Sequence, residues 1–117
     1  MRKMIIPSRN RDQEDGVAEY TKLRTGMYAI NVLGAHYRAE KVELTYHTYL
    51  VPGGPDIPCT TTRWKLYDAK GDLVIVQKGW NGAPPMVCHL SLRSAIIWAY
   101  GLEICKATTG RRELVNA

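Results

Sequence analysis

The chain has 117 residues and a formal net charge of +5 at pH 7, with 45% hydrophobic and 23% charged residues. This length suits one domain with one core, and this composition excludes disorder as the state of most of the chain. We therefore expect a single domain over residues 1–117, with residues 1–10 as a basic arm and residues 108–117 as a short tail. The positive charge permits an anionic partner, because basic surface attracts phosphate groups and acidic proteins.

Cysteine usage and hydropathy narrow the class of protein further. Cys59, Cys88 and Cys105 are an odd number of thiols with no CxxC pair, so the sequence predicts neither a disulfide framework nor a zinc site. The apolar run near the N-terminus is shorter than that of a signal peptide, and no run reaches the length of a bilayer span. We expect a cytoplasmic protein with no membrane partner and no cofactor.

The first predicted element is a helix over residues 12–24. Val17, Tyr20 and Leu23 recur at a spacing of three residues, which places them on one side of a helix. Acidic residues precede them, at the end where the helix dipole favours negative charge. Gly26 then ends the element.

The hydrophobic period changes to two after this point, which is typical of strands. Residues 27–39 form one predicted strand that is interrupted at Gly34, and residues 40–51 form the clearest strand of the chain. A loop with the sequence PGGPDIP separates it from a third strand over residues 59–67. These two strands are expected to pair as a hairpin.

A loop centred near Pro55 fixes the expected register of this hairpin. It places Tyr46 opposite Trp64 and Leu44 opposite Leu66, so that both strands agree on which face is the core. The other face then collects cations and aromatic rings. Cations neutralise phosphates and rings stack on bases, so this face suits a nucleic-acid backbone or a single strand. The candidate nucleic-acid-binding residues are Lys41, His47, Tyr49, Arg63, Lys65 and Tyr67.

The second half of the chain predicts two more strands and a helix. Residues 72–78 are apolar without alternation, which indicates a central strand covered on both faces. Residues 86–90 could form a short strand, and Ser91 or Ser94 could cap a helix that continues to about Ala107. Within this segment, residues 95–100 are the place where helix and strand are hardest to distinguish.

The predicted C-terminal helix is apolar around nearly its whole circumference, so it must be covered on more than one side. The expected fold class is α+β: an N-terminal helix, a mainly antiparallel sheet of four or five strands, and the C-terminal helix packed on one face. A sheet covers only one side of a helix, which favours a homo-oligomer or another obligate partner. The candidate partner-binding residues are Trp80, Ile97, Trp98 and Tyr100.

Catalytic patterns are weak. Cys88 and His89 are adjacent, and neighbouring residues point to opposite faces of a strand, which argues against a nucleophile and base pair. His36, His47 and His89 lack metal-ligand spacing. We therefore expect a binding protein without catalytic residues or a metal.

Trp80 lies within KGWNG, residues 78–82, where it could serve as an exposed binding anchor or fold back onto the core. These five residues resemble a segment of a phage family of anti-Thoeris nucleotide sponges, although the rest of the chain does not follow that family's pattern. The resemblance implies a phage-type accessory protein with a small ligand or a protein partner.

Three functions follow from these features, in order of preference. The first is nucleic-acid binding, to RNA or DNA, through the polar and aromatic sheet face. The alternative is a small phage-type or mobile-element-type inhibitor or adaptor that binds a host protein or a small nucleotide through Trp80 and Tyr49. A virion or assembly protein is a second alternative. Exposed Trp80 and Tyr49 side chains would favour the inhibitor or adaptor, whereas exposed lysine and arginine side chains would favour nucleic-acid binding.

Overall fold

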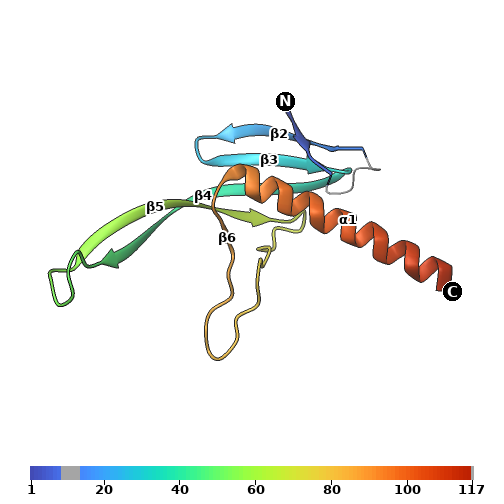
Figure 1. The fold of residues 1–117 in the computed structure, drawn as a ribbon. Helices are drawn as coiled ribbons and strands as arrows, with labels where there is room; N and C mark the ends of the chain where they lie inside the picture. Colours follow the sequence, from blue (N-terminus) through green and yellow to red (C-terminus); the bar gives the residue numbers. More distant parts are fainter. Residues whose placement is uncertain (9–13, 117) are drawn as a thin grey trace.

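Six antiparallel strands and one C-terminal helix make up the fold (Figure 1), seen in a computed structural model that describes residues 1–8 and 14–116, with side chains through residue 107. The strands are neighbours in chain order, so the sheet is a simple meander. This confirms the α+β class, with six strands where four or five were expected. The elements are β1 (Arg2–Ile6), β2 (Gly16–Arg24), β3 (Met27–Val32), β4 (Ala35–Thr48), β5 (Ile57–Tyr67), β6 (Cys88–His89) and α1 (Leu92–Asn116).

Helix α1 covers one face of the sheet, and the core lies between them (Figure 1). On the helix side, Ala95, Ile96 and Ala99 are fully buried. On the sheet side, Ile30 and Leu66 are the largest fully buried side chains. None of the described helices or strands packs on the opposite face, which we call the open sheet face.

The predicted N-terminal helix is wrong, because residues 16–24 form strand β2 between β1 and β3. Residues 12 and 13 of that prediction lie outside the described residues. Tertiary packing overrides the helical spacing: Ala18 is fully buried in the core, and a Cβ on Gly16 would lie 2.2 Å from the ring of Tyr100 in α1. The expected basic arm also contributes a strand, since β1 pairs with β2 at the edge of the sheet.

The register predicted for the β4 and β5 hairpin is wrong by five residues. Leu66 lies opposite Ala39 and Tyr46 lies opposite Cys59. The hairpin reverses at Pro52 and Gly53, where the Gly54 amide donates to the Val51 carbonyl at 2.9 Å and Gly53 has φ of 75°, as in a type II turn. Five is an odd number, so every side chain of β4 changes face relative to its expected partner in β5.

The predicted central strand over residues 72–78 is also wrong. This segment forms no continuous strand in the described part of the chain: its bridges, Leu73 with Tyr67 and Gln77 with Met86, are isolated, and Ile75 is 49% exposed. The short strand expected near residue 88 is present as β6, which pairs with β5 at two positions. Sequence hydrophobicity alone therefore overestimated how much of this segment is buried.

The C-terminal helix was predicted correctly in type, and its start is set by Ser91. The Ser91 Oγ accepts the Ser94 amide at 3.1 Å, which satisfies one free amide of the first turn. The helix runs to Asn116, past the expected end and through the expected tail. It is not buried all round, since Ile97 and Ile104 are 39% and 42% exposed.

Three segments project from the body and make the molecule long (Figure 1). Its extents are 60 × 37 × 32 Å and its radius of gyration is 17.8 Å, against about 13 Å for a compact domain of this length. The projecting segments are the end of α1, the outer part of the β4 and β5 hairpin, and a loop over residues 77–86. In the described part of the chain, no helix is long and apolar enough to cross a membrane.

A hydrogen-bonded cluster fixes the helix where it leaves the sheet. The Tyr37 hydroxyl of β4 donates to Glu103 of α1, and Lys106 donates to the same carboxylate at 3.1 Å. Burial, followed by the bond to Glu103, raises the pKa of Tyr37, and the bond from Tyr37 lowers the pKa of Glu103. The cluster therefore stabilises the ionised form of Glu103 and ties the helix to the sheet.

We expect Tyr37→Phe to lower the free energy of unfolding by about 1 to 2 kcal/mol, because it removes a hydrogen bond to a charged group and keeps the ring. Denaturant unfolding measures this loss. Tyr28→Phe is the control, because the Tyr28 hydroxyl is not part of this cluster. Equal stability of Tyr37→Phe and the wild type would mean that the bond does not anchor the helix.

Candidate binding surfaces

The loop over residues 77–86, which we call the Trp80 hairpin, is a small hairpin with its own hydrogen bonds. At its base the Met86 amide donates to the Gln77 carbonyl at 2.8 Å, and the Gln77 amide donates back to the Met86 carbonyl at 3.2 Å. At its tip the Ala83 amide donates to the Trp80 carbonyl at 3.1 Å. The chain therefore holds a defined conformation far from the core.

The tip turn needs the residue types that the sequence supplies. Asn81 and Gly82 have φ of 53° and 79°, the two successive positive values of a type I′ turn, and Asn-Gly is the preferred pair for that turn. A Cβ on Gly79 would lie 2.0 Å from the Ala83 carbonyl oxygen, so only glycine allows this close approach. Two prolines, Pro84 and Pro85, follow and restrict the backbone further.

Trp80 is the exposed anchor at this tip. Its side chain is 73% exposed, so the hairpin does not fold back as a lid on the core. An aromatic side chain of this kind buries about 150 to 250 Å² when a partner covers it. At about 25 cal/mol per Å², covering the exposed part of Trp80 would contribute about 3 kcal/mol to binding.

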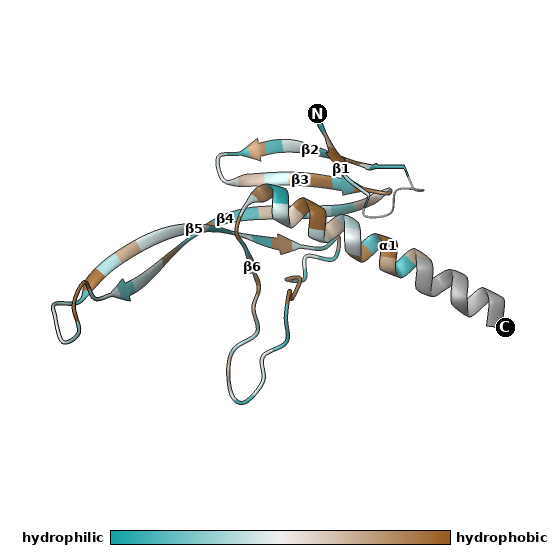
Figure 2. Cartoon of the chain, viewed as in Figure 1, coloured by the Kyte–Doolittle hydropathy of each residue, from teal (hydrophilic) through white to brown (hydrophobic). Residues whose placement is uncertain are grey.

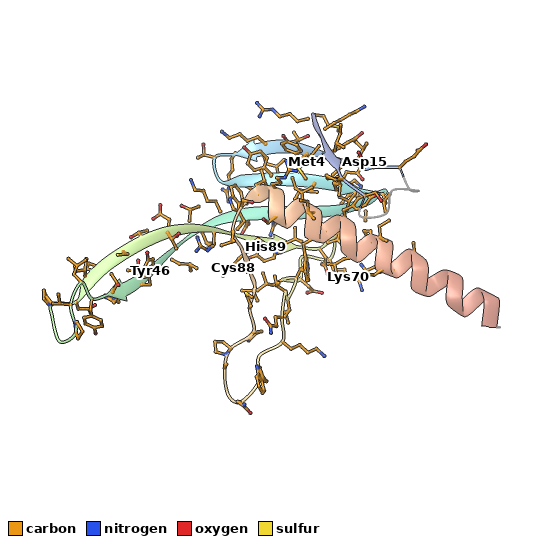
Figure 3. All side chains as sticks on the ribbon, viewed as in Figure 1. Met4, Asp15, Tyr46, Lys70, Cys88 and His89 are labelled. Carbon is orange, nitrogen blue, oxygen red and sulfur yellow. The ribbon has the colours of Figure 1, made fainter. Side chains whose placement is uncertain are left out.

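The outer part of the β4 and β5 hairpin, residues 42–48 and 57–63, forms a two-stranded ribbon with an apolar tip (Figure 2). Leu50 at the tip is 83% exposed and Tyr49 is 60% exposed. Along β4, Leu44 and Tyr46 lie on the side of the open sheet face and are 40% and 52% exposed. Figure 3 shows Tyr46 on this ribbon, well away from helix α1.

The predicted nucleic-acid-binding residues do not lie together. Arg63, Lys65 and Tyr67 alternate with the core residues Trp64 and Leu66, so they lie on the open sheet face. Lys41 lies opposite Trp64, on the helix side of the sheet, and His47 shares that side of the ribbon. Tyr49 lies beyond the end of β4, in the tip loop. The six residues are divided between the two faces because the expected register of β4 and β5 was wrong by an odd number of residues.

Arg38 is a cation on the open sheet face that the sequence analysis missed. Arg38 lies opposite Tyr67, with its guanidinium carbon 5.0 Å from the centre of that ring. The Arg38 Nε lies 3.4 Å from the Glu40 Oε1. The Arg63 guanidinium donates to the Thr61 hydroxyl at 2.6 Å. Two of the basic groups on this face therefore already have partners. Alternation along β4 with the correct turn at Pro52 would have placed Arg38 here.

The predicted partner-binding residues of α1 line a groove of about 470 Å³ between the helix and the end of β1. Ile97, Trp98 and Tyr100 contribute to its wall together with Ile6. Gly101 lies in this wall, and a Cβ there would meet nothing within 4 Å. The groove is mainly apolar, and Glu14 is the only carboxylate among the described residues that line it.

Cys88 and His89 point to opposite faces of β6, as their adjacency predicts. His89 lies opposite Trp64 and is 6% exposed, and its ring centre is 6.0 Å from that of Trp98. Its Nε2 and the Nε1 of Trp98 are buried, and neither has a hydrogen-bond partner among the described residues. Burial lowers the pKa of His89, so the structure favours its neutral form.

The lowered pKa of His89 predicts a loss of stability in mild acid. The unfolded chain binds a proton at His89 near pH 6.5, and the folded chain binds it only at lower pH. The free energy of unfolding should therefore be constant above about pH 7 and fall as the pH decreases below about 6.5. Denaturant unfolding from pH 7.5 to 5.5 tests this, and the decrease should be absent from His89→Leu. An unchanged decrease in that variant would assign the effect to other groups.

No group of three or more His, Cys, Asp or Glu side chains in the described ranges could hold a metal ion. Comparison with protein-family models, with curated proteins and with solved structures gives no match.

Proposed function

We propose that this protein is a small non-enzymatic binding protein of the inhibitor or adaptor class, which docks on a partner protein through the Trp80 hairpin. The observation that carries the proposal is Trp80, 73% exposed at the tip of a turn with a fixed conformation. The sequence alone favours nucleic-acid binding over an inhibitor or adaptor. The exposed aromatic anchor reverses this order and favours the inhibitor or adaptor.

The geometry of the hairpin supports tight binding for two reasons. A tryptophan that fills a partner's pocket is among the side chains that contribute most to protein interfaces. A hairpin that already holds its bound conformation loses little conformational entropy on binding. The matching surface on the partner is an apolar pocket deep enough for an indole ring.

The test compares capture of partner proteins by the full chain and by variants. Wild-type protein is immobilised and exposed to extract of its host, with nuclease present and at high salt. We expect a stoichiometric protein to be retained by the wild type and lost from Trp80→Ala. Leu90→Ala is the matched control, because Leu90 is 74% exposed and lies outside the hairpin.

Retention of the same protein by Trp80→Ala and by the wild type would contradict the proposal. So would a wild-type protein that retains no protein at all under these conditions. Circular dichroism of Trp80→Ala should match the wild type, because the side chain makes no contribution to the core.

Nucleic-acid binding is the second candidate, and the open sheet face is the observation that favours it. Lys65, Arg63 and Arg38 lie there beside Tyr67, in adjacent rows of the sheet. Three phosphate contacts give an affinity that decreases with salt with a slope of about −2 to −3 on logarithmic axes. Fluorescence anisotropy with a labelled single strand measures it, and Lys65→Glu should abolish it while Trp80→Ala should not. Salt-independent binding would exclude this surface.

A further inference from the structure

The outer part of β4 has an edge without a neighbouring strand. Strand β3 pairs with β4 only as far as Glu40, and none of the other described strands pairs with that edge beyond it. The Lys41 amide points to this edge, since it donates to the Gly26 carbonyl at 2.7 Å. Backbone groups alternate sides along a strand, so Glu43, Thr45 and His47 present their amides and carbonyls to the same open edge.

This edge lacks several of the features that usually protect edge strands. Residues 42–48 read VELTYHT, with no proline, glycine or lysine. The other edge of the ribbon is different, because Pro58 of β5 lies opposite His47 and has no amide to offer. A two-stranded ribbon is marginally stable alone, and a third strand makes it more stable. The ribbon therefore favours the addition of a strand at β4.

The sequence of the edge is complementary to itself. Antiparallel pairing of two copies about Thr45 places Glu43 opposite the second copy's His47. The Nδ1 of His47 lies 3.1 Å from Asp56 Oδ2 of its own chain, so its Nε2 is the ring nitrogen that can donate to the Glu43 carboxylate. It places Leu44 opposite Tyr46, and both lie on the side of the open sheet face. Charge pairs and aromatic–aliphatic pairs both stabilise neighbouring strands.

We infer that two copies of this chain form a symmetric dimer by antiparallel pairing of their β4 edges, centred on Thr45. The two ribbons then become one four-stranded sheet. The residues with outward amides oppose one another in this register, so the pairs Glu43 with His47 and Thr45 with Thr45 are hydrogen-bonded pairs.

Neighbouring symmetric registers are less favourable. Centring the pair on Leu44 places Lys41 opposite His47, which brings together two basic groups. Centring it on Tyr46 places Glu43 opposite Tyr49, outside the end of the strand, and shortens the pairing. The charges of Glu43 and His47 thus select the register about Thr45.

The dimer is independent of the proposed function and adds a property to it. Two Trp80 hairpins on one particle would raise the apparent affinity for a partner that presents two pockets. Trp80→Ala should leave the mass of the dimer unchanged. Failure of the partner-binding proposal can therefore be distinguished from failure of the dimer proposal.

The test uses proline at two matched positions of the ribbon. Thr45 and Thr60 lie opposite each other, and the outward amide of Thr45 means that Thr60 also points outward, to the other edge. Thr45→Pro therefore removes one amide from the proposed interface, and Thr60→Pro removes one from the opposite edge. Neither removes a hydrogen bond between β4 and β5.

Sedimentation equilibrium of the full chain gives the result. We expect the wild type and Thr60→Pro to have twice the mass of the 13.2 kDa chain, and Thr45→Pro to require at least about tenfold more protein to reach it. A wild type that stays at the mass of one chain at millimolar concentration would overturn the proposal. So would a Thr45→Pro variant that dimerises as the wild type does, or two proline variants that are equally impaired.

A charge exchange confirms the register. Glu43→Lys places lysine opposite histidine, and His47→Glu places glutamate opposite glutamate, so each variant alone should be monomeric. Mixed together, the two variants restore opposite charges at both positions and should form a 1:1 dimer. A mixture that stays monomeric while the wild type dimerises would show that the pairing is not centred on Thr45.

Discussion

Replacing Gly79 by valine should lower the affinity for the captured partner by at least about tenfold, or 1.4 kcal/mol, although Trp80 itself is retained. The reason is steric. A Cβ at residue 79 would lie 2.0 Å from the Ala83 carbonyl oxygen, so the tip turn cannot close and Trp80 loses its fixed position. Isothermal titration calorimetry with the purified partner measures the change. The partner then binds an ensemble of loop conformations, which adds an entropic cost.

The control for Gly79→Val is a glycine of another turn. Gly71 has φ of 86°, and a Cβ there would meet nothing within 4 Å, so Gly71→Ala introduces only local backbone strain. It should leave the affinity unchanged. Wild-type affinity in Gly79→Val would mean that the hairpin conformation does not matter, and that Trp80 acts as a flexible anchor.

Replacing Leu66 by alanine should lower the free energy of unfolding by about 2 to 5 kcal/mol. Leu66 is fully buried in β5, opposite the fully buried Ala39, beneath helix α1. Alanine removes the apolar contacts of the larger side chain and leaves a cavity that the small neighbour cannot fill. Such a loss is a large part of the total stability of a domain, which is about 5 to 15 kcal/mol.

Urea unfolding with an unchanged m-value measures this effect. Leu23→Ala on β2 is the control, since Leu23 is 55% exposed and its truncation should cost less than about 1 kcal/mol. Equal losses in the two variants would contradict the assignment of the core to the face that α1 covers.

Local turn signals in the sequence were good guides to the fold. Gly34 was expected only to interrupt one strand over residues 27–39. With Leu33 it forms a turn of two positive φ values between β3 and β4, and β4 continues past residue 40, where a new strand was expected. Ser91 caps the helix through a bond to the Ser94 amide. These features depend on neighbours in the chain, so a sequence pattern can identify them.

The errors arose where distant contacts decide the structure. Residues 16–24 carry a helical spacing, and they form a strand because β1 and β3 pair on both sides of them. The register of the β4 and β5 hairpin depended on which proline of the loop begins the turn, and Pro52 with Gly53 was the better signal. With the turn at Pro52 and Gly53, Lys41 and Arg63 lie on opposite faces of the sheet and not on the same face as expected.

The candidate sites were predictable to different degrees. Trp80 was identified from KGWNG, and its exposure depends on the Asn81–Gly82 turn, which the same five residues encode. The open edge of β4 was not predictable, because it results from β3 being shorter than β4. Which edge of a strand stays open depends on the length of the neighbouring strand, and the sequence of one strand does not give that length.

Site-specific photocrosslinking at residue 80 tests the central claim most directly. Trp80 is replaced by benzoylphenylalanine in the full chain, and the same probe is placed at Lys70, an exposed residue of another turn, as the reference position. After irradiation in cells that express the chain, we predict one crosslinked protein at residue 80 and none at residue 70. Equal labelling at both positions, or crosslinks to nucleic acid alone, would contradict the assignment of Trp80 as the anchor for a partner protein.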